Sequence, residues 1–316
     1  MQRRPRLLSR SCFLVGLGLA SASSAQDASG LSYVTAPPEN VTVTGSRVPP
    51  DQILHDFIAS YTAPSPASGK VARWHDGICP GVAGVPASWQ KSVTARVREI
   101  AKQVGTPVAP DNCRPNIDIV FTKNPQALLN DVRAKKPYLL GYHDAAQEKR
   151  LATVSHALQS WYLTQTVDSQ GGTFIDDKLK PPGDLTFTSG SNSFTFPNAH
   201  VEYWSGSHLG DERRSELIHV LVVVDLTKVN GVHLSAVEDE VAMLSLAQTA
   251  AFDVCQPIPS IANLTAPGCD VRLKPGNIST SDWAYLHALY SIAPTDSLIQ
   301  QQGKIAFEMK KSLSGP

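Results

Sequence analysis

Four cysteines outside the first 25 residues, Cys79, Cys113, Cys255 and Cys269, constrain the fold most strongly. An even number of cysteines in an exported chain indicates disulfides, and four cysteines allow three pairings. We expect the sequential pairing, Cys79 with Cys113 and Cys255 with Cys269, because the second pair then closes a short loop around a proline-rich turn. Zinc is the rival interpretation, but the chain has no Cys-x-x-Cys pair and no Cys-x-His spacing. The sequence therefore predicts a disulfide-stabilised protein without a metal.

The first 25 residues have the composition of a secretory signal peptide. A basic start is followed by the apolar residues 12–20 and by small residues that end at Ala25. A membrane anchor is the alternative, but this apolar run is far shorter than the roughly 20 residues that a spanning helix needs. We expect cleavage near Ala25 and a periplasmic or secreted mature protein. The basic residues of the leader are Arg3, Arg4, Arg6 and Arg10.

Charge and hydropathy exclude several kinds of partner. The chain has 28 basic and 28 acidic residues, and loss of the four leader arginines leaves a formal charge of about −4. This charge argues against nucleic acid as a partner. Even the apolar run at residues 217–226 is interrupted by His219 and Asp225, so we expect no membrane span. An envelope protein or a small ligand is the expected partner, and no cofactor is expected.

Proline content separates an N-terminal arm from the main domain. Residues 26–69 are poor in apolar side chains up to Pro50 and contain two Pro-Pro pairs, which predicts a flexible arm. Within it, residues 51–61 place Ile53, Leu54, Phe57 and Ile58 on one face of a short helix. Residues 70–316 are expected to form a single α+β domain.

Hydrophobic periodicity predicts the elements of that domain. A spacing near 3.6 predicts helices at residues 88–104, 235–249, 281–291 and 297–313, and Pro125 is typical of the first position of another helix. Strands are predicted at residues 116–121, 153–166 and 216–225. Short hairpins are expected around Phe187, Phe194 and Phe196. The resulting fold class is α+β, with packed helices on a mixed sheet.

No complete catalytic or cofactor-binding motif is present. Gly206-Ser207-His208 resembles a serine-hydrolase elbow, but the serine stands one position too early. No Walker loop and no Gly-x-Gly-x-x-Gly sequence follows a strand, so nucleotide binding has no support. We therefore assign no catalytic, cofactor-binding or metal-binding residue.

One polar cluster offers an alternative enzymatic hypothesis. Histidines and acids gather in the loop before the strand at residues 216–225, where solvated side chains are the simpler interpretation. The alternative is a periplasmic hydrolase in which this loop faces three acids on the helix at residues 235–249. The residues concerned are His200, Glu202 and His208 in the loop and Glu238, Asp239 and Glu240 on the helix.

The C-terminal part resembles the zincin-like metallopeptidases of the matrixin type. Leu244-Ser245-Leu246 stands where that family has Leu-Gly-Leu, and residues 278–290 resemble its "LSxxDxxxIxxLYG" segment. The resemblance places the family's first histidine, its general-base glutamate and its second histidine at Glu238, Asp239 and Ala242. Alanine cannot bind zinc, and a catalytic zinc needs three protein ligands. The resemblance therefore implies a degenerate zincin-like scaffold without peptidase activity.

Two further resemblances concern the exported character of the chain. Residues 41–47, from Val41 to Arg47, are similar to a segment near the start of TonB-dependent receptor plugs, which raises the hypothesis of an envelope partner that docks there. Residues 70–312 resemble a group of exported alphaproteobacterial proteins without an assigned activity. The segments that carry this second similarity begin at Trp74, Cys113, Gln159, Cys255 and Asp282. We expect a non-catalytic binding or structural protein.

Overall fold

The computed structural model describes residues 51–65, 67–141, 149–176, 185–189, 192–196, 212–249 and 254–314. The predicted signal peptide, its cleavage point at Ala25 and the segment from Val41 to Arg47 lie outside this part of the chain. The loop residues His200, Glu202 and His208 also lie outside it. Within the described ranges, no helix has both the length and the apolar composition required to cross a bilayer.

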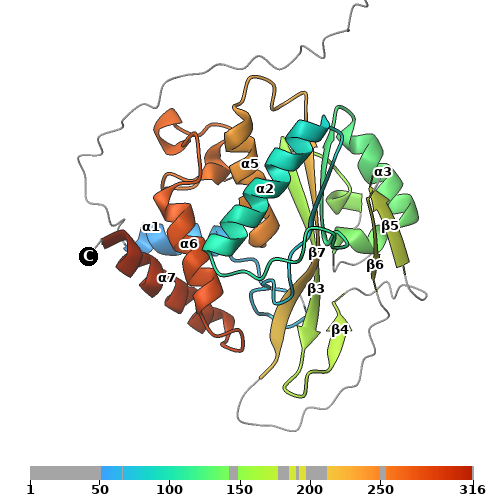
Figure 1. Ribbon diagram of the computed structural model, residues 1–316. Coiled ribbons are helices and arrows are strands. Elements are labelled where there is room, and N and C mark those ends of the chain that lie inside the picture. Colours follow the sequence, from blue (N-terminus) through green and yellow to red (C-terminus); the bar gives the residue numbers. More distant parts are fainter. Residues whose placement is uncertain are drawn as a thin grey trace, which may run out of the picture.

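A five-stranded mixed sheet forms the centre of the structure (Figure 1). The strand order is β1-β2-β7-β3-β4, in which β1, β2 and β7 are parallel and β3 is antiparallel to β7 and β4. The α+β class with a mixed sheet is thereby confirmed. The strands are β1 (Pro80–Ala83), β2 (Ile117–Thr122), β3 (Leu158–Val167), β4 (Thr173–Ile175) and β7 (Arg214–Asp225); β5 (Leu185–Ser189) and β6 (Asn192–Phe196) form a separate hairpin.

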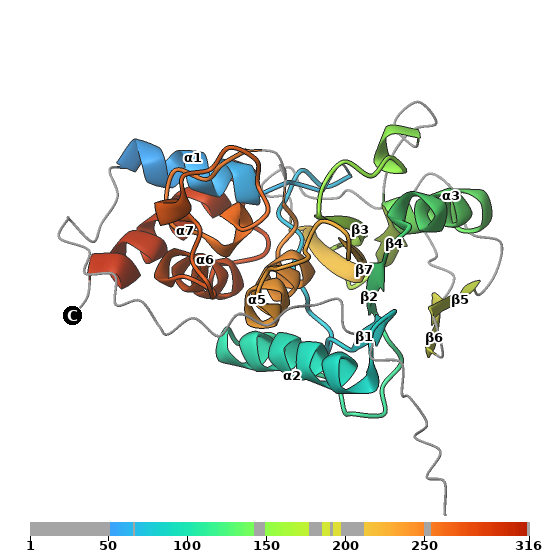
Figure 2. The same ribbon diagram turned by 90° about the horizontal axis from the view of Figure 1, so that it is seen from above.

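Helices cover both faces of the sheet, most of them on one side (Figure 2). The larger group lies over one face, and α3 lies with the short 3₁₀ helix η1 over the other. The larger group consists of α1 (Asp51–Tyr61), α2 (Ala87–Gln103), α5 (Leu234–Leu246), α6 (Thr280–Ser291) and α7 (Leu298–Ser314); α3 spans Pro125–Lys135 and η1 spans Pro137–Leu140. Every helix predicted from periodicity is present among these.

The central strands are apolar on both faces because each face is covered. Val220 and Val222 of β7 enter the larger core, together with Val97 of α2. Leu221 and Val223, the alternate residues of the same strand, enter the smaller core under α3. A strand between two helical layers buries both sets of alternating side chains, which explains its continuous apolar sequence.

Helix α5 is buried along nearly its whole length, and aromatic side chains satisfy its C-terminal carbonyls. The Tyr162 hydroxyl donates to the carbonyls of Leu244 and Ala247, both at 2.9 Å. The indole of Trp74 and the hydroxyl of Tyr290 donate to the next carbonyls, those of Ser245 and Leu246. These donors compensate the unpaired carbonyls of a buried helix end. The helix therefore ends at Leu246, three residues before the predicted end at 249.

Strand β3 begins five residues later than the sequence predicts, at Leu158 rather than Thr153. Side-chain amides form hydrogen bonds with the backbone groups of residues 153–155, which would otherwise have extended the strand. Gln159 donates to the Thr153 carbonyl and accepts from the Ser155 N–H, and Gln126 of α3 accepts from the Val154 N–H. Backbone groups bound in this way are no longer available for strand pairing.

Two disulfides form with the sequential pairing that was expected. Cys79 and Cys113 link the start of β1 to the loop before β2, with a Cα–Cα distance of 6.0 Å. Cys255 and Cys269, 5.3 Å apart by the same measure, close a loop between α5 and α6. Each bridge restricts the unfolded chain more than the folded one and so raises the free energy of unfolding.

Replacement of Gly84 should test how tightly β1 approaches β2. Its φ is +85°, and a Cβ at this position would lie 1.8 Å from the carbonyl oxygen of Phe121. We expect Gly84→Ala to lower the free energy of unfolding by about 3 kcal/mol, because the strained φ and the backbone clash both disfavour alanine. Urea denaturation measures the change. Gly276→Ala is the control, since a Cβ there meets no atom within 4 Å; equal effects of the two substitutions would contradict the interpretation.

Candidate functional site

Helix α5 carries the three acidic side chains of the hydrolase hypothesis, and all three are buried. Glu238, Asp239 and Glu240 are exposed by only 7%, 1% and 4%. Since consecutive helical residues point about 100° apart, these carboxyls contact different neighbours. The loop histidines lie outside the described residues, and the three acids themselves do not converge on one cleft.

Glu238 and Asp239 face helix α2. Arg96 of α2 donates from Nε to Oδ1 of Asp239 at 2.5 Å, and Oδ2 of Asp239 accepts from the backbone N–H of Ile278 at 2.7 Å. This bond with Asp239 raises the pKa of Arg96. Burial raises the pKa of Glu238, an effect opposed by a hydrogen bond with Ser92. Asp239 thus joins α2, α5 and the segment before α6 as a structural ion pair.

Glu240 faces away from α2, toward the loop between α5 and α6. Its Oε1 accepts from Thr265 Oγ1 at 2.8 Å, while Oε2 is buried without a hydrogen bond to any described residue. Burial raises the pKa of Glu240 to about 8, and the carboxyl of Asp282 adds to this rise, whereas Thr265 and Lys274 oppose it. Glu240 is therefore mostly protonated at neutral pH.

A second buried carboxyl, Asp282, organises the start of α6. Its side chain accepts from the backbone N–H of Ser279 at 2.8 Å, and Ser279 Oγ accepts from the N–H of Asp282, which is a capping box. Ser260 Oγ and the Ile261 N–H also donate to Asp282, at 2.6 and 2.8 Å. Sequence analysis missed this role, although a serine three residues before an acid at a helix start is a recognisable signal.

His219, which lies on β7, forms a buried pair with Asp118 of the neighbouring strand β2. The distance from Nε2 to Oδ2 is 3.4 Å, and both residues are fully buried. Burial raises the pKa of Asp118, and His219 and Lys136 oppose this rise. Because neither side chain has any exposed surface, the pair is inaccessible to a substrate in this conformation and acts as a polar link within the sheet.

The zinc-ligand positions implied by the zincin resemblance hold no ligand set. Ala242 is fully buried in the larger core, and Asp239 is occupied by Arg96 and Ile278. Within the described ranges, no three His, Cys, Asp or Glu side chains stand close enough to hold a metal ion.

A groove along the outer side of β1 and α2 is the accessible feature that sequence analysis did not find. Its volume is about 760 Å³, and the Cys79–Cys113 bridge lies in its wall. Lys91, Arg98 and Lys102 of α2 line it, at a spacing of seven and four residues that keeps them on one helix face. The sequence spacing alone could have indicated a cationic helix face, but cations on a helix are more often simply solvated.

The acidic groups in the groove are already paired. Glu99 is bound by Arg96 at 2.8 Å, and Asp111 by Arg98 at 2.9 Å. Arg98 also donates to the Ala109 carbonyl, which fixes the guanidinium in the groove wall. The backbone positions of Lys91 and Lys102, both exposed, lie about 16 Å apart along the helix, because 11 residues rise 1.5 Å each. The groove is therefore cationic at both ends.

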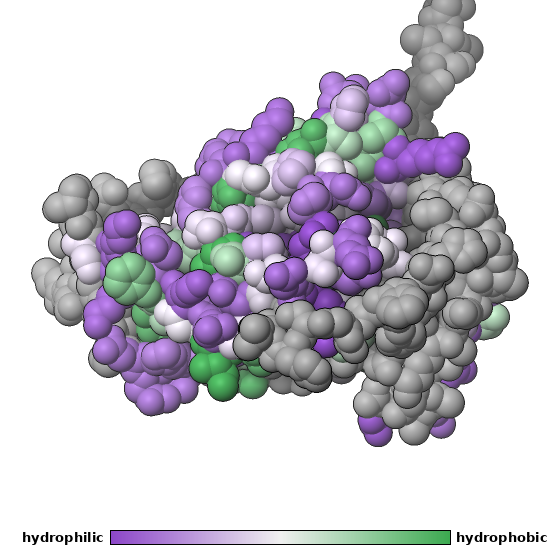
Figure 3. Space-filling view, turned by 90° about the horizontal axis from the view of Figure 1, so that it is seen from below, coloured by the Kyte–Doolittle hydropathy of each residue, from purple (hydrophilic) through white to green (hydrophobic). Residues whose placement is uncertain are grey.

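Apolar surface is a weaker candidate for binding. The exposed apolar side chains of α7 are Ile299 and Phe307. The lysines of α7 are each paired with an acid: Lys304 with Asp296, Lys310 with Asp51, and Lys311 with Glu308. In Figure 3, hydrophobic side chains form small patches separated by hydrophilic ones. Single apolar residues of this kind are normal on a protein surface.

Comparison with known proteins identifies no relative. No protein-family model matches the chain, and neither a curated protein nor a solved structure is significantly similar to it.

Substitution of Glu240 should change the pH dependence of stability. Because its pKa is about 8 in the folded state and near 4.5 in the unfolded state, the folded protein retains a proton that the unfolded chain releases. The free energy of unfolding therefore falls by about 1.4 kcal/mol per pH unit between about pH 5 and pH 8. We expect Glu240→Gln to remove this decline and to stabilise the protein at pH 8.

Urea denaturation at pH 5, 6.5 and 8 measures this difference. Glu308→Gln on α7 is the control, because Glu308 lies at the protein surface. If the free energy of unfolding changed with pH in the same way in the wild type and in Glu240→Gln, Glu240 would not be the group that binds the extra proton.

Proposed function

We propose that the chain is an exported, non-catalytic binding protein on a degenerate zincin-like scaffold, and that it binds an extended acidic peptide in the groove between α2 and β1. The observation that carries the proposal is a groove with Lys91 and Lys102 at its two ends, neither of which forms an ion pair with a described residue, while its acids Glu99 and Asp111 are paired with arginines. Export rests on the composition of the leader and agrees with the two disulfides.

Contacts between the two zincin-like segments support the scaffold proposal. The segment at residues 278–290 bonds α5 directly through Ile278 to Asp239 and Tyr290 to Leu246. Asp282 of the same segment accepts from Ser260 of the loop whose Thr265 donates to Glu240. Leu246 belongs to the Leu-Ser-Leu sequence that replaces Leu-Gly-Leu. The helix and the following segment thus keep a close mutual packing while the ligand positions hold alanine and buried acids.

The absence of chemistry at these positions supports a non-catalytic role. A zinc peptidase needs neutral histidines and a glutamate that is free to activate water. Ala242 offers only a methyl group, and the carboxylate of Asp239 is bound on both oxygens. A binding role needs none of these groups.

The geometry of the groove favours an extended peptide as the ligand. Ile78 directs its N–H and C=O to the outer side, where they bond Pro107 and Ala109. Because alternate residues of a strand face the same side, Val82 directs its N–H and C=O outward as well, where no described strand pairs with β1. A peptide can bond such edge groups, and acidic side chains at its two ends would match Lys91 and Lys102.

Zinc content tests the scaffold part of the proposal. We expect purified mature protein to contain far less than one equivalent of zinc, since the ligand positions lack imidazoles. Inductively coupled plasma mass spectrometry after dialysis against metal-free buffer measures it. One tightly held equivalent, retained at neutral pH, would contradict a non-catalytic assignment.

Charge reversal tests the groove. We expect the double variant Lys91→Glu, Lys102→Glu to bind a fluorescein-labelled octapeptide of alternating glutamate and valine at least tenfold more weakly than the wild type, because two attractive charges become repulsive. Fluorescence anisotropy measures binding, and wild-type affinity should fall as salt rises. The control is Lys135→Glu, Lys311→Glu, which makes the same charge change on exposed lysines elsewhere. Equal affinity of the two variants would remove the groove as the binding site.

A further inference from the structure

The loop between α5 and α6 covers the two buried carboxyls that have no part in the groove. Thr265 of this loop donates to Glu240, and Ser260 and Ile261 donate to Asp282. Three apolar side chains of the loop, Ile258, Ile261 and Ala266, are also buried. Residues 255–269 therefore act as a lid, which supplies the donor that bonds Glu240 and two of the donors that bond Asp282.

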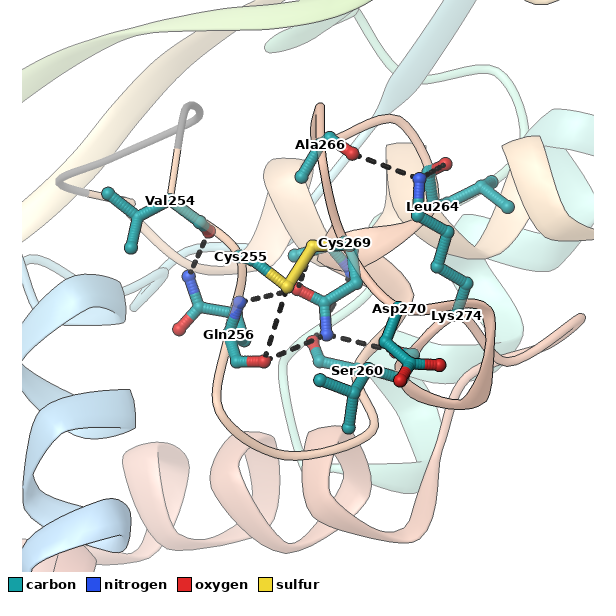
Figure 4. Close-up of a disulfide and its surroundings, with 12 residues drawn as sticks. Val254, Cys255, Gln256, Ser260, Leu264, Ala266, Cys269, Asp270 and Lys274 are labelled. Carbon is teal, nitrogen blue, oxygen red and sulfur yellow. Dashed lines mark hydrogen bonds between the residues drawn. A yellow bond between two sulfur atoms is a disulfide. The ribbon is translucent and has the colours of Figure 1, made fainter.

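A disulfide and a buried amide link parts of the lid to one another. Cys255 and Cys269 join its two ends across the loop (Figure 4). Inside the loop, Asn263 donates from Nδ2 to the carbonyls of Ile258 and Leu273, at 3.0 and 2.9 Å, and accepts from the Gln256 N–H. The disulfide is partly exposed, whereas Asn263 is fully buried. A reductant can thus reach the bridge without opening the core first.

Burial favours the neutral form of Glu240 while the lid is closed, although a cation lies near its carboxyl. Lys274, the cation near Glu240, donates to the carbonyls of Ala266 and Leu264 (Figure 4). Burial raises the pKa of Tyr61 on α1 and Glu240 adds to this rise, so that this phenol stays neutral. For Glu240 itself, burial is the largest cause of the raised pKa, and Asp282 of α6 also disfavours a negative charge, whereas Lys274 favours one. Water that enters on lid opening reverses this preference, because a solvated carboxyl ionises at its ordinary pKa near 4.5.

We propose that residues 255–269 form a redox-gated lid, which the Cys255–Cys269 disulfide keeps closed and which, once that bridge is reduced by a dithiol, opens with release of the Glu240 proton. In the exchange, a thiolate of the dithiol attacks one sulfur and the second cysteine leaves as thiolate. The second thiol of the reductant then attacks the mixed disulfide at the reductant's own sulfur, and the remaining protein cysteine leaves as a thiolate. Two protein thiols and one oxidised dithiol result, so two electrons and two protons are transferred.

The equilibrium constant for lid opening depends on pH in a defined way. The closed lid holds a protonated Glu240 up to about pH 8, and the open lid holds an ionised one above about pH 4.5. One proton is released for each opening, so the opening constant rises about tenfold per pH unit across this interval. Above pH 8 the slope should vanish, because Glu240 is then ionised in both states. Asp282 adds less, since it keeps its bonds to Ser279 at the start of its own helix.

Hydrogen–deuterium exchange tests the proposal on the full chain. The double variant Cys255→Ser, Cys269→Ser stands for the reduced state and retains the Cys79–Cys113 bridge. Protection factors, corrected for the intrinsic exchange rate, are followed by mass spectrometry for peptides that contain the Ile261 amide at pH 5.5, 6.5 and 7.5. We expect protection in the double variant to fall about tenfold per pH unit. Protection in the oxidised wild type should be at least tenfold higher at pH 7.5.

Addition of Glu240→Gln to the double variant should lower this slope by about one log unit per pH unit, while Glu308→Gln should leave it unchanged. If the double variant does not fold, wild type reduced after folding with dithiothreitol gives the same comparison. Three results would each overturn the proposal: equal protection with and without the bridge, protection independent of pH once the bridge is absent, or an unchanged slope with Glu240→Gln.

Discussion

Burial of helix α5 is the constraint on which the rest of the structure depends. A helix buried between the sheet and helices α2 and α6 must have partners for its terminal carbonyls and for its polar side chains, since water cannot reach them. Tyr162, Trp74 and Tyr290 bond the last carbonyls from β3, the segment before β1, and α6. Arg96 and the Ile278 N–H bond Asp239 from two further elements. Strand β3, the segment before β1, and helices α2 and α6 are therefore all bonded to this one helix.

These bonds also explain how acids on a central helix act as structural links. An ion pair such as Arg96 with Asp239 compensates the desolvation of both charges only while both partners remain in place. A carboxyl used in this way has no free oxygen with which to activate water. Glu240 compensates its burial differently, by retaining a proton, which makes it sensitive to pH instead of reactive. Residues that resemble a degenerate active site in sequence thus act as structural links.

Periodicity predicted most of the fold because apolar burial follows simple geometry. The helical pattern around Val97 determines which face of α2 meets the sheet, and the structure places Val97 in the larger core. Side-chain bonds to the backbone are not periodic, so the ends of α5 and β3 could not be predicted. The amide of Gln126, which displaces the start of β3, acts from a helix 28 residues away in sequence. The groove could not be predicted for a related reason. Lys91 and Lys102 are ordinary surface lysines in the sequence, and only the position of β1 beside α2 makes them part of a groove.

The groove and the lid respond to different properties of the surroundings. Lys91 and Lys102 attract a ligand through exposed charges, which salt screens at distances near 10 Å. Glu240 and Asp282 are buried, so salt screens them little, and the redox state of a single bridge controls their access to water. The Cys79–Cys113 bridge, by contrast, lies in the groove wall and fixes β1 beside α2. The two disulfides therefore have separate roles, one in shaping a binding surface and the other in closing a buried acidic layer.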